Sequence, residues 1–340
     1  MKPTTIYDVA REAGVSIASV SNAINGKGKI GKKKREEILK VMERLNYQPS
    51  VIASALTGKK TYTLGLLIPD VANPFFAEIA RAVEDIAHSA GYSVITCSTD
   101  NQDERVLAYI RLLEQKSVDG ILIGTGGGAD ILAQLAEKPL PTVTIAREVQ
   151  GLPVSGVATD DFRGATLAAA HLLALGHRRM AVLAEDLKVS SSQERVRGFR
   201  FSLFEAGIRL EDRDILPCAS SIEDGKRATL ELLRREDRPT AVFCSNELLA
   251  VGALQAAREA GISVPAELSV VGYDNTLLST ATNPLLTTIA QPIEQMVKLA
   301  FELLIGSGQE SAGLVPQRIV MQPELVERES TAMPGTAELD

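Results

Sequence analysis

Along most of the chain, the pattern of apolar and polar positions switches repeatedly between the period of a strand and that of a helix. Short apolar runs predict strands at 64–68, 94–97, 120–123, 142–145, 180–183, 241–244 and 269–273. Helical spacing between these runs predicts helices at 75–90, 103–115, 130–136, 161–175, 192–206, 224–234 and 247–260. Strands that alternate with helices form βαβ units and parallel sheets. The pattern weakens and restarts around 151–159, which favours two sheets, and a last helix is expected at about 292–305 with strand-like residues after it.

The first 60 residues have a purely helical pattern instead. One apolar stripe at helical spacing consists of Ile6, Val9, Ala10 and Ala13. Thr5 can cap this helix together with Asp8, and Gly14 can end it in a left-handed conformation. Ser16 then caps a second helix, so the segment predicts a helix, a tight turn and a helix.

The second helix turns Val20 and Ile24 inward and carries small or polar residues on its other face. Such residues can read base edges and phosphates in a major groove, although an ordinary pair of packed helices would show the same apolar stripes. The residues that we expect to contact DNA are Thr5, Ser16, Ile17, Ala18, Ser19, Ser21, Asn22, Asn25, Lys33, Ala53 and Leu56.

The distribution of charge favours the DNA-binding interpretation. Residues 1–60 contain twelve Lys or Arg and five Asp or Glu, a net charge of +7, whereas the whole chain has −7 and residues 61–340 therefore −14. A basic segment on an acidic protein indicates a polyanionic partner for that segment. Lys32, Lys33, Lys34 and Arg35 open a third predicted helix that runs to about Leu45. Cations at a helix N-terminus oppose the macrodipole, and a phosphate backbone over that end would offset this cost.

A linker follows, in which a short helix can begin at Pro49 and end at Gly58. Eight or nine residues are too few for a stable isolated helix, so we expect it to form only when DNA holds it. Ala53 and Leu56 share one face and can enter a minor groove as a wedge. A plain interdomain linker is the alternative, but its apolar residues are unusual for one.

Together with motifs further along the chain, these features make the sequence resemble the lactose-repressor and galactose-repressor family of transcriptional regulators along nearly its whole length. The resemblance rests on segments 8–10, 13–16, 20–21, 25–26, 47–49, 65–70, 73–76, 171–172, 175–179, 195–199, 245–246, 270–274 and 286–289. It implies an α/β protein with a helix-turn-helix headpiece and a core like that of periplasmic binding proteins, made of two doubly wound parallel-sheet lobes.

The same resemblance implies the domain boundaries. They are a DNA-binding domain at 1–48, a hinge helix or linker at 49–61, an effector-binding and dimerisation core at 62–330 and a flexible tail at 331–340. Lobe one is expected at about 62–159 and 291–320, and lobe two at about 160–290 and 321–330. The tail has no heptads, so no tetramerising coiled coil is expected.

The family likeness also implies a function: sequence-specific binding of double-stranded operator DNA by a homodimer that represses carbohydrate-utilisation genes. A small-molecule effector, a sugar or sugar derivative, would bind between the lobes and switch operator affinity. Carried over position by position, its contacts are Asn73, Phe75, Phe76, Arg147, Arg195, Asn246 and Asp274. Control by a protein partner is the alternative, and a solute-binding module a weaker one.

This sequence departs from the family at several positions. Many relatives carry Arg where this chain has Asn22, and Asp where it has Ala146. Many also have an aromatic residue that stacks on the ligand, whereas the stretch 219–221 has none and the chain contains no Trp. The effector of this chain is therefore not given by the resemblance.

The sequence gives little support for a secreted protein, a membrane protein, a metalloprotein or an enzyme. The chain opens without an apolar leader and has no run long enough to span a membrane, so a cytoplasmic protein is expected. Its three cysteines are consistent with reduced thiols, and its three histidines lack metal-ligand spacing. The glycines at 124–128 are not followed by the Lys-Ser/Thr of a phosphate-binding loop, and no Gly-x-Ser-x-Gly occurs. We therefore expect no enzyme activity, no cofactor and no metal.

Overall fold

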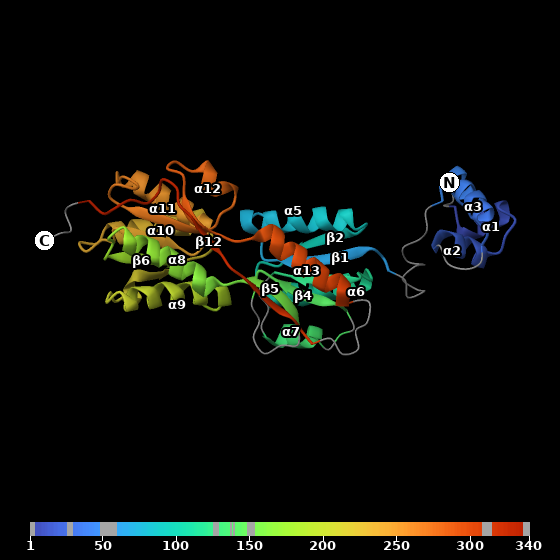
Figure 1. Ribbon diagram of the computed structural model, residues 1–340, viewed down its shortest axis with the longest axis horizontal. Coiled ribbons are helices and arrows are strands. Elements are labelled where there is room, and N and C mark those ends of the chain that lie inside the picture. Colours follow the sequence, from blue (N-terminus) through green and yellow to red (C-terminus); the bar gives the residue numbers. More distant parts are fainter. Residues whose placement is uncertain are drawn as a thin grey trace. The chain divides into compact units, whose positions relative to one another are not determined.

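The computed structural model describes residues 4–25, 30–47, 60–124, 129–136, 138, 140–147, 154–307 and 315–335. The chain divides into two compact units, Met1–Thr61 and Tyr62–Asp340, which are described separately below (Figure 1). The hinge segment expected to hold Ala53 and Leu56 lies outside the described residues.

The first unit consists of the helices α1 (Ile6–Glu12), α2 (Ile17–Asn25) and α3 (Lys32–Arg44). The local signals in the sequence account for their ends. Thr5 and Asp8 form a reciprocal capping box, Gly14 adopts a φ of +60°, and the Ser19 N–H donates a hydrogen bond of 3.1 Å to Ser16 Oγ. The small core that joins the helices contains Val9, Ala10, Ala13, Val20, Ala23, Ile38 and Met42.

The second unit begins with a six-stranded sheet in the order β11-β5-β4-β3-β1-β2, whose strands are all parallel. These strands are β1 (Thr63–Ile68), β2 (Ser93–Ser98), β3 (Gly120–Ile123), β4 (Thr142–Ile145), β5 (Ser155–Thr159) and β11 (Arg318–Met321). Helices α5 (Pro74–Ser89) and α13 (Ile293–Ser307) pack on one face, and α6 (Asp103–Gln115) and α7 (Ala129–Ala136) on the other (Figure 1). We call this part lobe one.

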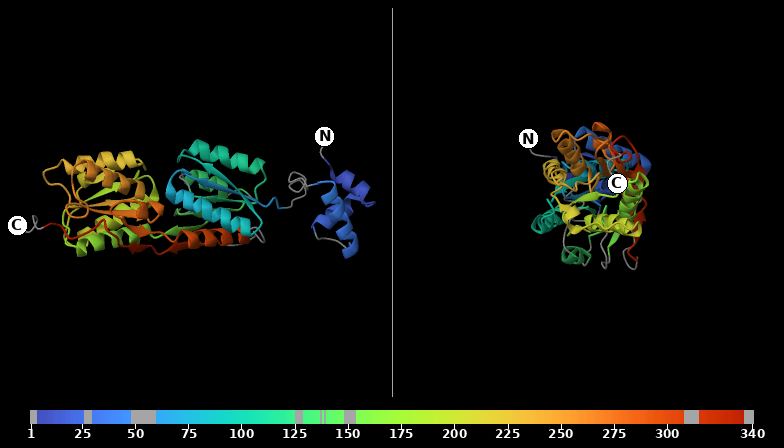
Figure 2. Two further views of the ribbon diagram at one scale, coloured as in Figure 1. Left: turned by 90° about the horizontal axis from the view of Figure 1, so that it is seen from above. Right: turned by 90° about the vertical axis from the view of Figure 1, so that its left-hand side faces the viewer.

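Lobe two is built on a second six-stranded sheet, in the order β12-β10-β9-β8-β6-β7. Its strands are β6 (Met180–Ala184), β7 (Ile215–Pro217), β8 (Ala241–Cys244), β9 (Ser269–Asp274), β10 (Thr287–Ala290) and β12 (Glu324–Val326). Helices α8 (Asp161–Ala174) and α9 (Ser190–Glu205) cover one face, and α10 (Ile222–Leu233) and α11 (Glu247–Glu259) the other (Figure 2). Short helices η1 (Asp212–Asp214) and α12 (Leu277–Ala281) lie in its connections.

The chain passes between the lobes after β5, after β10 and again between β11 and β12. Each lobe is therefore assembled from discontinuous segments, and the carboxyl ends of strands from both sheets face the same interlobe space. Ligands of α/β proteins bind at such strand ends.

The predicted fold class is confirmed, but several elements differ from the sequence prediction. Strand β5 lies at 155–159, where the apolar pattern weakens, because its residues Ser-Gly-Val-Ala-Thr are small. Strand β7 and helix α12 were not expected at all. Strand β12 pairs antiparallel with β10, which corrects the expectation of purely parallel sheets, because the chain enters lobe two there from β11 and runs back along its edge.

Candidate DNA-binding surface and interlobe site

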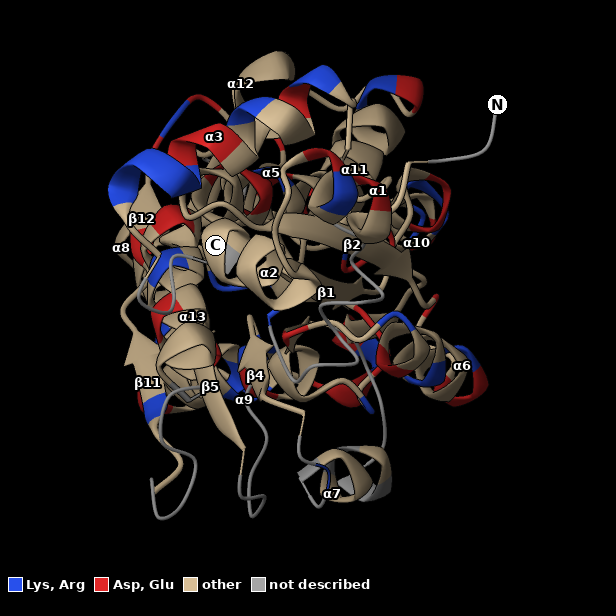
Figure 3. Cartoon of the chain, turned by 90° about the vertical axis from the view of Figure 1, so that its right-hand side faces the viewer, with Lys and Arg blue, Asp and Glu red and all other residues tan. Residues whose placement is uncertain are grey.

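The exposed face of α2 carries the residues expected to read DNA. Ile17, Ala18 and Asn22 are exposed, whereas Val20 is fully buried against α1 and α3. Ser21 is half-buried, and the side chain of Asn25 lies outside the described part of the chain. The helix contains no charged residue, as Figure 3 shows. An uncharged helix face suits contacts with base edges, which need hydrogen bonds and apolar groups.

The predicted polar contacts at the ends of α1 and α2 are partly engaged within the headpiece. The Thr5 hydroxyl donates to Asp8 Oδ2 at 2.6 Å, and the hydroxyls of Ser16 and Ser19 are 3.0 Å apart. These groups hold the helix ends in place. Contact with a phosphate would require the hydroxyls to share or exchange these bonds.

The basic turn at the start of α3 divides into two pairs with different surroundings (Figure 3). Lys34 Nζ donates to the Ala13 carbonyl at 3.3 Å, and Arg35 Nε donates to the Ala23 carbonyl at 3.0 Å. Both carbonyls lie at helix C-terminal ends, where cations are favourable. These two cations therefore stabilise the headpiece itself, which the sequence analysis did not foresee. Lys32 and Lys33 are exposed.

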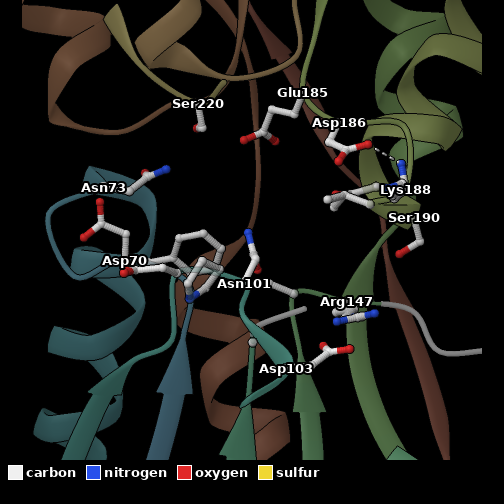
Figure 4. Close-up of a pocket in the computed structure, with 17 residues that line it drawn as sticks. Asp70, Asn73, Asn101, Asp103, Arg147, Glu185, Asp186, Lys188, Ser190 and Ser220 are labelled. Atoms are coloured by element: carbon white, nitrogen blue, oxygen red, sulfur yellow. Dashed lines mark hydrogen bonds between the residues drawn. The ribbon is translucent and has the colours of Figure 1, made fainter. Parts of the chain in front are cut away.

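Between the two lobes lies a cavity of about 570 Å³, a volume suited to a small molecule (Figure 4). Lobe one contributes residues that directly follow its strands, including Asp70, Asn73, Phe76, Asp100, Asn101, Asp103 and Arg147. Lobe two contributes residues after β6 and β7 and at the start of α9: Glu185, Asp186, Lys188, Val189, Ser190, Ser191 and Ser220. Every contributing loop lies at the carboxyl end of a strand.

The local sequence explains how lobe one presents its polar side chains. Asn73 caps α5, because its Oδ1 accepts a hydrogen bond from the Phe75 N–H at 3.0 Å. Asp100 and Asn101 both have positive φ values, 52° and 54°, in the sharp turn after β2. Burial lowers the pKa of Arg147, and the charge of Asp103 partly offsets this. Arg147 and Asp103 lie beside each other at one end of the cavity (Figure 4).

Of the seven residues predicted to bind the effector, the structure places Asn73, Phe76 and Arg147 in the cavity wall. Phe75 packs instead in the core of lobe one with 6% of its surface exposed, and its ring meets Phe76 edge-on at 5.0 Å between centroids. Helical geometry explains this difference, because adjacent helix residues point about 100° apart and only one of the pair can face the cavity.

The other three predicted residues are buried in lobe two, and two of them, Asn246 and Asp274, line a narrow crevice there together with Asn73 and Phe75 of lobe one. Arg195 Nε donates to Asp161 Oδ1 at 2.8 Å, its Nη1 donates to the Ser245 carbonyl, and its guanidinium stacks 3.6 Å above the Tyr273 ring. Burial lowers the pKa of Arg195, but nearby Asp161, Tyr273 and Asp274 raise it more, so it stays charged.

Asp274 and Asn246 connect this buried cluster to its surroundings. Asp274 Oδ1 lies 3.8 Å from Arg195 Nη1 and accepts a 2.7 Å hydrogen bond from Gln291 Nε2. Burial raises the Asp274 pKa well above its usual value, although Arg195 opposes the shift. Asn246 caps α11 and donates to Ser220 Oγ at 2.9 Å, so it meets the cavity through Ser220. The side chains of Arg195, Asn246 and Asp274 therefore all form hydrogen bonds with other groups of the protein.

Sequence reasoning missed all the acidic residues described in the cavity wall: Asp70, Asp100, Asp103, Glu185 and Asp186. A signal for them was present, because each follows a predicted strand by a few residues and the carboxyl ends of parallel strands meet at one edge.

Comparisons with known proteins agree with this architecture. A sequence model described as "Bacterial regulatory proteins, lacI family" matches residues 5–50, and one described as "Periplasmic binding proteins and sugar binding domain of LacI family" matches residues 61–325. The HTH-type transcriptional regulator DegA of Bacillus subtilis (strain 168) is 41% identical over 335 residues, which cover 97% of this chain and 98% of DegA.

Solved structures show the same likeness. The Lac repressor dimer bound to operator and the anti-inducer ONPF has a TM-score of 0.87 and 30% identity, with 97% of this chain and 100% of that chain covered. A LacI family regulator from Enterococcus faecium with bound ribose has a TM-score of 0.72 and 32% identity, with 80% and 99% covered. A headpiece with an exposed α2 and two lobes around a cavity thus define a DNA-binding transcriptional regulator. The chain belongs to the LacI family.

The described residues also bear on membrane and metal-binding classes of protein. No helix there is long and apolar enough to cross a membrane. Nor do His, Cys, Asp and Glu side chains gather there in a group of three or more that could hold a metal ion.

Proposed function

We propose that this LacI-family regulator represses its genes by binding a symmetric operator as a homodimer, and that a small molecule held between the lobes switches its operator affinity. The observation that carries the proposal is the cavity of about 570 Å³ at the strand ends of both lobes, lined by polar side chains from each. A ligand that contacts both lobes binds one lobe arrangement better than another, and this difference in affinity is what shifts a conformational equilibrium.

Three of the relatives support a sugar or sugar derivative as the ligand class. The Enterococcus faecium regulator holds ribose, the regulator CelR forms a cellobiose complex, and another relative is named a ribose operon repressor. In this chain the predicted contacts in the wall are Asn73, Phe76 and Arg147. The amide and guanidinium groups can hydrogen-bond hydroxyls, and the ring of Phe76 provides an apolar surface.

Pairing of two chains would place two headpieces on two half-sites, as a symmetric operator requires. We assign the pairing to α5 and to the α11 residues Leu248, Val251, Leu254 and Gln255. Leu248, Val251 and Gln255 are partly exposed, whereas Leu254 is 9% exposed and packs into the core of lobe two. The nearby Leu277 is 73% exposed, which suits an interface residue.

Selection of bound sites from random duplexes, with the full chain and with a fragment of residues 62–340, tests this function. The full chain should enrich a palindromic motif, with affinity that falls steeply as salt rises because phosphate contacts release counterions. The fragment, which corresponds to the second compact unit, should remain dimeric and enrich nothing. Enrichment of the same motif by the fragment would contradict the proposal.

A further inference from the structure

The interlobe cavity contains more acidic than basic side chains. Among the residues that the structure describes, its wall includes five carboxylates, of Asp70, Asp100, Asp103, Glu185 and Asp186, but two cations, Lys188 and Arg147. Because a cavity wall excludes much of the surrounding water, these charges act on a ligand more strongly than charges on an open surface would.

Some of the carboxylates are balanced by cations of lobe one. Asp100 Oδ2 lies 2.5 Å from Arg105 Nη1, and Asp103 faces Arg147, whose pKa its charge raises. The carboxylates left to act on a ligand are those of Asp70, Glu185 and Asp186, and the positive charge of Lys188 opposes them. The remaining charge is therefore negative.

Glu185 is the best placed of these three acids. Its main chain is held on both sides, because its N–H donates to Ser245 Oγ at 3.0 Å and its carbonyl accepts from Ser192 Oγ at 2.9 Å. Its half-buried side chain extends from lobe two into the cavity (Figure 4). In the described part of the chain, no hydrogen-bond donor or cation pairs with its carboxylate.

A half-buried carboxylate that the protein does not pair is available to accept a hydrogen bond from a donor of the ligand. Hydroxyl and ammonium groups are donors, whereas phosphate and carboxylate groups are acceptors at neutral pH. A phosphate or carboxylate group on the ligand would add a like charge to the cavity, whether or not hydroxyls of the same ligand donate to Glu185. Arg147, the cation best suited to receive an anion, already interacts with Asp103.

Resting on the function proposed above, we propose that the effector is a polyhydroxy compound without an anionic group, and that Glu185 accepts hydrogen bonds from its hydroxyl or ammonium donors. Sugar phosphates and sugar acids are excluded by the same carboxylates. Glu185 is in this account a residue that determines specificity for neutral and amino-substituted sugars.

Binding of matched sugars to the full-length chain tests the inference. Each set has one carbon skeleton in four forms: the neutral hexose, the 2-amino hexose, the hexose 6-phosphate and the hexuronic acid, for glucose, galactose and mannose. Thermal shift followed by titration calorimetry should find ligands among the neutral and amino forms alone. Tighter binding of a phosphate or acid form would overturn the inference and leave the proposed function intact. Absence of binding by all twelve compounds would contradict the inference, whereas the proposed function is tested separately by the operator selection described above.

A substitution then tests the role of Glu185. Glu185→Gln should weaken binding of the best neutral ligand roughly 10-fold or more, because a hydrogen bond to a charged group is lost, and weaken the amino form further. The anionic form of the same skeleton should bind the variant better than it binds the unmodified chain. Glu205→Gln, at an exposed position on α9 outside the cavity wall, is the matched control and should change nothing. Equal affinities of the Glu185→Gln variant and the control for all forms would overturn the assignment.

Discussion

At the scale of single residues, two polar side chains illustrate how position determines chemistry in this protein. Asn22 is exposed on α2, and Glu247 is buried at the start of α11 with 2% of its surface exposed. Asn22 can therefore contact DNA, whereas Glu247 contacts groups in the protein interior. Each leads to a prediction that depends on its surroundings.

Replacing Asn22 with Arg should move the preferred operator towards G·C pairs under α2. Arg pairs bidentately with guanine, whereas Asn suits adenine, and a good pair discriminates by roughly 1–3 kcal/mol. The neighbouring Ile17 and Ala18 can contact a thymine methyl, so the unmodified chain should favour A·T there. Selection from random duplexes with both proteins measures this. Identical motifs would show that residue 22 does not face a base.

Burial raises the pKa of Glu247 to about 7, although two hydrogen bonds from Thr276 favour its charged form. A carboxyl whose pKa is higher in the folded state binds protons on folding, so stability falls as pH rises from its unfolded pKa of about 4.5 to about 7. Glu247→Gln should remove this slope and leave the variant more stable than the unmodified chain at pH 8, by at most about 3 kcal/mol.

Denaturant unfolding of both proteins between pH 4.5 and pH 8 measures this effect, with Glu205→Gln as the control at an exposed site. Parallel pH profiles for the Glu247→Gln variant and the unmodified chain would show that folding does not raise the pKa of Glu247.

At the scale of elements, the lobes meet through a specific contact between helices. Glu78 on α5 of lobe one accepts a hydrogen bond at 3.0 Å from the N–H of Leu277, the first residue of α12 in lobe two. Nearby, Thr159 donates to Gln291 Oε1 at 2.7 Å, which joins two of the segments where the chain passes between lobes. These bonds favour the lobe arrangement seen here.

Glu78→Gln should weaken operator binding roughly 2- to 10-fold, because it removes the charge from one hydrogen bond that favours this arrangement. The direction follows from the likeness of the structure to the operator-bound Lac repressor, with a TM-score of 0.87. Fluorescence anisotropy with the selected duplex gives the two dissociation constants. Glu302→Gln, an exposed position on α13 of the same lobe, serves as control. An unchanged dissociation constant for Glu78→Gln would show that the contact does not bias the lobes.

Elements with local signals were predicted well, whereas elements defined by distant partners were not. The caps at Thr5 and Ser16 lie within four residues of the atoms they bind, so the sequence displays them. Strands β7 and β12 have three residues each, and their pairing with β6 and β10 sets them, which no local pattern records. Arg195 was predicted to face the effector, but its burial depends on Asp161, 34 positions away, and on Tyr273.

At the scale of the whole molecule, the chain combines a basic headpiece with an acidic core. Residues 1–60 have a net charge of +7 and residues 61–340 have −14, so attraction to DNA is confined to the headpiece unit. The cavity belongs wholly to the second unit. A ligand there can affect DNA binding through a change of lobe arrangement, with a typical coupling of roughly 1–3 kcal/mol.

The most direct test of this account is the dissociation constant of the full-length chain for its selected operator, measured with and without a saturating cavity ligand. The account predicts a change of roughly 5- to 150-fold in one direction. It also predicts the reciprocal change in ligand affinity when operator is present, because coupling between two sites is mutual. The same operator affinity with and without a ligand shown to occupy the cavity would contradict it.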